Sequence, residues 1–123
     1  MARLLVVCVC LAASVNQAGP PAASLAYKGA RLLCTEHVNA GPIHIVWQSH
    51  ATSDPVDTVV AHYERTTGQK ATVRADGAHR IELQADHYLS IYPSASNDAF
   101  PHCGVKPTPR ERTVIQISEA ARQ

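Results

Sequence analysis

Histidines are frequent in this chain, and their type and spacing could support metal binding or a response to pH. Seven occur in 123 residues, and six of the seven lie within 37–87. His44 and His50 are separated by an even number of residues, so they share one face of a strand. That face could bind zinc, copper, an anion or a pH-dependent partner, because imidazole is a common metal ligand that titrates near neutral pH. The alternative interpretation is the solvated polar face of a half-exposed sheet.

Cys34 and Cys103 allow a second kind of chemistry. Cys34 with His37, and His102 with Cys103, could supply two sulfurs and two imidazoles to zinc. On a strand, however, Cys34 and His37 point to opposite faces, and two adjacent ligands suit tetrahedral coordination poorly. Two of the four cysteines, Cys8 and Cys10, lie in the N-terminal segment that we interpret below as a removable export signal. The remaining pair in an exported domain predicts a disulfide between Cys34 and Cys103, with two buried free thiols as the alternative. The bond would close a loop of about 70 residues and stabilise the fold by about 4 kcal/mol in the chain-entropy treatment.

A catalytic triad can be drawn within one loop, but little supports it. Ser94, Ser96, Asp98 and His102 share the segment 93–112. Serine, aspartate and histidine are common in loops, and no strand-turn-helix elbow presents either serine as a nucleophile. A small hydrolase is therefore only a third alternative, and no residue is assigned a catalytic role.

The aromatic residues suggest a ligand groove. Tyr88 and Tyr92 share a strand face, and with Phe100 they could line a groove beneath the loop. Together with Trp47, these residues hold most of the aromatic area of the chain. The alternative for these four residues is ordinary packing in the core and anchoring of the loop.

Composition excludes several classes of protein. Apolar residues make up 46% of the chain and charged residues 17%, which fits neither a disordered chain nor a coiled coil. The formal charge is +1, so there is no basic excess to neutralise phosphates, and nucleic acid is not an expected partner. No phosphate-binding, dinucleotide-binding or zinc-protease motif occurs, so we assign no cofactor.

The N-terminus resembles an export signal. Arg3 precedes an apolar run of twelve residues, 4–15, whereas a membrane-spanning helix needs roughly 20. We predict a signal peptide over 1–18, with cleavage after Ala13 or Ala23 as alternatives, and a buried N-terminal helix or strand as the competing interpretation. A flexible leader over 19–26 and a single domain over 27–123 follow. The expected location is periplasmic or secreted, without a stable membrane anchor once the signal is removed.

Hydrophobic periodicity predicts the secondary structure. Pro55 fits the first turn of a helix over 55–67, with Ser53 or Asp54 as its N-cap and Gly68 as its C-cap. Its apolar stripe leaves His62 exposed. Asp76 and Gly77 mark a hairpin turn. The predicted strands are 30–38, 43–51, 69–75, 78–84, 87–92 and 113–118, the last followed by a polar tail over 119–123.

These elements predict an α+β domain in two layers. One amphipathic helix would pack on a mostly antiparallel sheet of about five to six strands. If Ile43, Ile45 and Trp47 face the helix, then His44 and His50 face the other side of the sheet. The segment 93–112 would be a long loop without secondary structure, held by Cys103.

Two motifs carry a resemblance to a known group of proteins. Tyr27-Lys-Gly-Ala30 opens a strand, and Thr52-Ser-Asp-Pro55 leads into a helix that contains Val59, Val60 and Tyr63. Over 27–92 this resembles small exported bacterial α+β proteins of unknown function, although Lys28 and His62 depart from the usual residues. The resemblance implies a fold and a compartment but no activity. We therefore expect a non-catalytic binding or accessory module, with a histidine-based zinc or copper protein as the alternative and the partner unknown.

Overall fold

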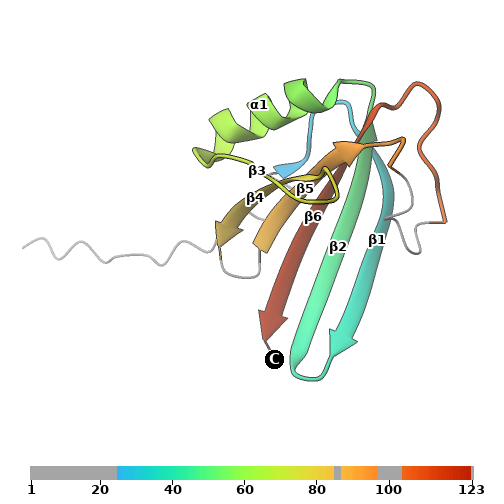
Figure 1. The fold of residues 1–123 in the computed structure, drawn as a ribbon. Helices are drawn as coiled ribbons and strands as arrows, with labels where there is room; N and C mark the ends of the chain where they lie inside the picture. Colours follow the sequence, from blue (N-terminus) through green and yellow to red (C-terminus); the bar gives the residue numbers. More distant parts are fainter. Residues whose placement is uncertain (1–24, 85–86, 97–103, 123) are drawn as a thin grey trace, which may run out of the picture.

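A computed structural model describes residues 25–84, 87–96 and 104–122. In these ranges one helix packs with a six-stranded antiparallel sheet, as predicted, and the fold is mostly sheet (Figure 1). The elements are β1 (Arg31–Ala40), β2 (Ile43–Thr52), α1 (Val56–Thr67), β3 (Thr72–Val73), β4 (His79–Gln84), β5 (His87–Pro93) and β6 (Thr113–Arg122). The strand order in the sheet is β1-β2-β6-β5-β4-β3. Within the described ranges, no helix has the length and hydrophobicity needed to cross a membrane.

Helix α1 begins one residue later than predicted. Pro55 is the N-cap, and no side chain caps the helix, so the predicted cap by Ser53 or Asp54 is wrong. The Asp54 carboxylate instead accepts a hydrogen bond of 2.6 Å from the Tyr27 hydroxyl. Gly68 ends the helix as predicted, in the left-handed conformation with φ 71°, and its N–H donates to the Glu64 carbonyl.

The main core lies where α1 covers β4 and β5. Val59 and Tyr63 of the helix are at most 1% exposed, and the Tyr63 hydroxyl donates to the Leu25 carbonyl at 2.5 Å. The predicted core position Ile81 is fully buried, and Leu83 packs against the same cluster. His62 is half-buried rather than exposed as predicted, because its ring meets the Tyr27 ring edge-on at 5.0 Å. The buried cluster consists of Leu25, Val59, Val60, Tyr63, Ile81, Leu89, Ile91, Ile115 and Ile117.

The side chains of β2 lie on the opposite faces of the sheet from those considered from the sequence. His50 pairs directly with Ile115, a residue of the core beneath α1, and direct cross-strand partners lie on the same face. His44 shares this parity, so both histidines lie on the helix side of the sheet. Ile43 and Trp47 consequently lie on the opposite face. The apolar alternation of β2 misled the assignment because α1 contacts β4 and β5, two strands at the other side of the sheet.

Strand β6 is longer than predicted. The expected polar tail continues the strand to Arg122, which pairs with Ile43 of β2. Backbone pairing with β2 overrides the weak strand preference of the Glu-Ala-Ala sequence. Strand β5 begins opposite Glu119, so β1, β2 and β6 extend beyond the end of β5 (Figure 1).

Part of the predicted 93–112 loop is held by an ion pair. Arg31 of β1 donates from Nη2 to Glu111 Oε1 at 2.6 Å, and the Thr108 N–H donates to the same oxygen at 2.8 Å. The hydrogen bond from Arg31 lowers the pKa of Glu111 to about 2. The Ser94 N–H also donates to the Arg112 carbonyl at 2.8 Å. These contacts anchor the described part of the loop to the edge of the sheet.

Candidate functional site

The turn between β3 and β4 forms one rim of a groove. As predicted, Asp76 and Gly77 lie at the turn, where Gly77 adopts φ 85°. The Arg74 N–H donates to the Ala78 carbonyl at 2.9 Å, and the Ala78 N–H donates to Asp76 Oδ1 at 3.0 Å. The second of these bonds joins backbone and side chain, a kind of contact that stabilises a tight turn. Arg74 and Asp76 are thereby held at a fixed position beside the sheet.

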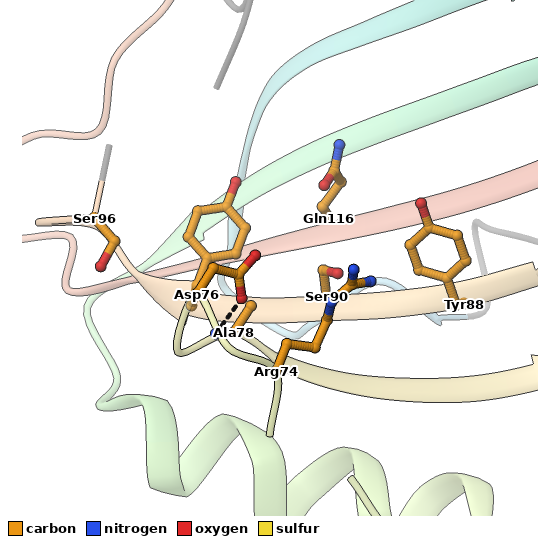
Figure 2. Close-up of a pocket in the computed structure, with 8 residues that line it drawn as sticks. Arg74, Asp76, Ala78, Tyr88, Ser90, Ser96 and Gln116 are labelled. Atoms are coloured by element: carbon orange, nitrogen blue, oxygen red, sulfur yellow. Dashed lines mark hydrogen bonds between the residues drawn. The ribbon is translucent and has the colours of Figure 1, made fainter. Parts of the chain in front are cut away.

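The floor of the groove is the sheet face opposite α1. Tyr88, Ser90 and Tyr92 alternate along β5 and point to this face, and Gln116 of β6 pairs directly with Ser90. The groove has a volume of about 550 Å³, within the range of small-molecule sites. Figure 2 shows the Arg74 side chain extending toward Ser90. The full lining is Arg74, Asp76, Ala78, Tyr88, Ser90, Tyr92, Ser96 and Gln116.

The polar groups of the groove differ in how they are engaged. Across the described ranges, the Arg74 guanidinium makes no hydrogen bond or ion pair, whereas Asp76 caps its own turn. The Arg80 guanidinium lies 3.8 Å from the centre of the Tyr88 ring and forms an ion pair with Glu82 at 3.3 Å. This stacking fixes the orientation of the Tyr88 ring. Burial raises the pKa of Tyr92, whose hydroxyl therefore stays protonated at neutral pH.

The four aromatic residues considered from the sequence have different positions. Tyr88 and Tyr92 line the groove, while Phe100 lies outside the described residues. Trp47 is on the same face and in the same cross-strand row as Tyr88, with Ser118 between them, but it does not line the groove. Sequence reasoning missed Arg74, Ser90 and Gln116, and it considered Ser96 only as part of a possible triad. The Asp-Gly turn could have located Arg74, but only the strand order brings this turn beside β5.

The candidate metal residues His44 and His50 are not brought together. His44 Nε2 lies 3.1 Å from Nδ1 of His37, and His44 Nδ1 lies 2.6 Å from Oδ1 of Asn39. His50 is buried, and its Nε2 has no hydrogen-bond partner. Burial lowers the pKa of His50. In the part of the chain that the structure describes, no group of three potential ligands could enclose a metal ion.

The predicted disulfide and triad fall partly outside the described residues. Cys34 lies in β1 just after a bulge, and Cys103 is outside the described ranges, so the disulfide stays a prediction. Asp98 and His102 are also outside these ranges. The Ser94 hydroxyl donates to the Glu111 carbonyl at 2.6 Å, which gives this serine a structural contact within the loop.

The two motifs that carry the resemblance to exported proteins meet in space. The Tyr27 hydroxyl donates to Asp54, and this bond raises the pKa of Tyr27 to about 12. The resemblance itself remains a prediction. No protein-family model matches the chain, and no curated protein or solved structure matches it either.

Proposed function

We propose that this chain is an exported, non-catalytic binding module that holds a small ligand on the sheet face opposite α1. The observation that carries the proposal is the groove of about 550 Å³, in which two tyrosines adjoin a guanidinium without a partner among the described residues. Export is supported by Arg3 and the apolar run over 4–15. Val59, Val60 and Tyr63, all buried on α1, support an amphipathic helix and a two-layer arrangement. In that arrangement the second face of the sheet is left for binding.

The lining favours a ligand with an aromatic or aliphatic part and an anionic group. Tyr88 and Tyr92 offer apolar ring surface, while Ser90 and Gln116 offer hydrogen bonds from the floor. Arg74 can form a bidentate pair with a carboxylate, because its guanidinium is not already paired with one. The lining has no nucleophile held beside a general base, so binding fits these residues better than catalysis.

A titration with a matched pair of probes tests the proposal. N-acetylphenylalanine carries a ring and a carboxylate, and N-acetylphenylalanine amide lacks the charge. We expect the carboxylate probe to shift the amide NMR signals of Tyr88, Ser90 and Gln116, and the amide probe to bind at least several-fold more weakly. A charged hydrogen bond contributes about 1.5–3 kcal/mol, so Arg74→Gln should weaken binding about tenfold or more.

Arg65 provides the matched control. It is an exposed arginine in the last turn of α1, away from the groove, so Arg65→Gln should leave binding unchanged. Equal affinity for both probes, or equal loss in both variants, would remove Arg74 as the recognition residue. Signal shifts confined to other regions would refute the groove as the binding site.

A further inference from the structure

We propose that His37 and His44 form an open binding site for a divalent transition metal, with copper(II) bound most tightly. The two residues lie on the β1–β2 hairpin, with His37 in the cross-strand row where β5 begins and His44 beyond it. Asn39 pairs directly with His44, and His37 pairs with Val46, so the two imidazoles are diagonal neighbours on one face. This site is separate from the proposed groove, which lies on the opposite face.

The distance between the two rings suits chelation. His37 Nδ1 and His44 Nε2 are 3.1 Å apart, and the ring planes are inclined by 36°. Two nitrogens at about 2.0–2.1 Å from one metal, with an angle of about 90–110° between them, lie about 2.9–3.4 Å apart. The separation of the two nitrogens therefore suits two neighbouring positions of a metal's coordination shell. In the hydrogen bond the two nitrogens face each other, so metal binding requires both side chains to rotate until their lone pairs converge on one ion.

Asn39 sets the protonation of His44 for this role. Its Oδ1 can only accept, so the contact of 2.6 Å places a proton on Nδ1 of His44 and leaves a lone pair on Nε2. A carbonyl oxygen that accepts a hydrogen bond from the ring nitrogen not bound to the metal is a usual means of orienting a metal-binding histidine. In the metal-free pair, His37 Nδ1 donates to His44 Nε2. Metal binding requires the His37 proton to transfer to its Nε2 through solvent, which leaves both imidazoles neutral.

The donor set selects the metal. The affinity of imidazole nitrogen for divalent ions of the first transition row is highest for copper(II). Val46 pairs directly with both His37 and Glu119, so Glu119 lies on the same face, one strand beyond β2. Because the described residues offer no third ligand within reach, water or an external donor must complete the shell. The site is therefore open rather than enclosed.

The test is titration of the untagged mature protein with copper(II), and separately with nickel(II) and zinc(II). We expect one copper ion per chain at micromolar concentration, an electron paramagnetic resonance spectrum with nitrogen couplings, and selective broadening of the His37 and His44 NMR signals. Copper should bind at least tenfold more tightly than zinc. His37→Ala and His44→Ala should each weaken copper binding at least tenfold.

Asn39→Ala tests the positioning of His44. It removes no ligand, yet should weaken copper binding about tenfold or more, as loss of an orienting partner does. His79→Ala, on β4 and outside the pair, is the matched control and should leave affinity unchanged. Affinity unchanged in the His37→Ala/His44→Ala double variant, broadening centred on other histidines, or binding only at millimolar copper would overturn the proposal. Failure of the groove to bind its probes would leave this outcome unaffected.

Discussion

The substitution Val59→Ala removes two methyl groups and is expected to destabilise the protein by about 2–3 kcal/mol. Val59 is 0% exposed and belongs to the core cluster between α1 and the sheet. Each buried methyl-sized group contributes about 0.8 kcal/mol by transfer, so two contribute about 1.6 kcal/mol. The cavity left in a close-packed site adds to this cost, while the higher helix propensity of alanine offsets about 0.5 kcal/mol.

Thr58 offers a matched control for this prediction. Threonine and valine have nearly the same shape, and Thr58 is the exposed neighbour of Val59 on α1. Thr58→Ala makes the same truncation and the same gain in helix propensity but removes no buried group, so stability should stay within about 0.5 kcal/mol. Urea unfolding followed by circular dichroism measures both variants. Equal losses in the two would mean that α1 does not bury Val59, and the assigned helix face would be wrong.

Four further outcomes are expected. The free energy of unfolding should fall as pH drops below about 6.5, because burial lowers the folded-state pKa of His50 and the unfolded chain then binds the proton more strongly. The variant His50→Asn should lack this pH-dependent loss when its stability is measured across the same pH range. Glu111 should contribute to the free energy of unfolding above its unfolded pKa, and this contribution should be lost as pH falls from about 4.5 to about 2. Unfolding of the protein and of Glu111→Gln across that pH range measures it. Thiol titration of the denatured, unreduced mature protein should find Cys34 and Cys103 paired, and their double serine variant should lose a few kcal/mol and expose the loop to protease. Intact mass of the exported protein should correspond to cleavage near Ala18, and a cytoplasmic species starting at Met1 would contradict the signal.

Local signals in the sequence predicted much of the fold. The repeat of Val56, Val59, Val60 and Tyr63 indicated the face of α1 that is buried, and Gly68 marked its end. Asp-Gly at 76–77 located the β3–β4 hairpin, whose loop consists of residues 75–77 between the paired residues Arg74 and Ala78. Each of these features depends on residues that lie close together in the sequence.

The features that depend on distant pairing were not predicted. Strand β6 reaches Arg122 because β2 supplies its backbone partners, and no periodicity in Glu-Ala-Ala indicates this. The Arg31–Glu111 pair joins residues 80 apart. Likewise, Arg74 adjoins Tyr88 only because β4 pairs with β5, so the groove could be anticipated from its tyrosines but not from its charged rim.

The bulge in β1 also had no sequence signal, yet it decides which residues share a face. The pairing shifts between Leu32 and Cys34, so Leu33 and Cys34 both lie on the sheet face away from α1. Leu33 joins the buried cluster on that face that contains Tyr92. From Cys34 onward the alternation of β1 is reversed relative to a regular strand.

The His37–His44 pair, in contrast, could have been predicted from turn chemistry. The predicted strands 30–38 and 43–51 leave four residues, 39–42, between them, whereas Ala40 pairs with Ile43 and only Gly41 and Pro42 form the turn. Glycine at the first central position, with the positive φ of 62° that Gly41 adopts, is typical of a two-residue hairpin turn. A two-residue turn sets the register of the whole hairpin, which places His37 and His44 diagonally on one face. The even spacing of His44 and His50 along one strand directed attention to His50, because the pairing of the two predicted strands was not used to place His37 beside His44.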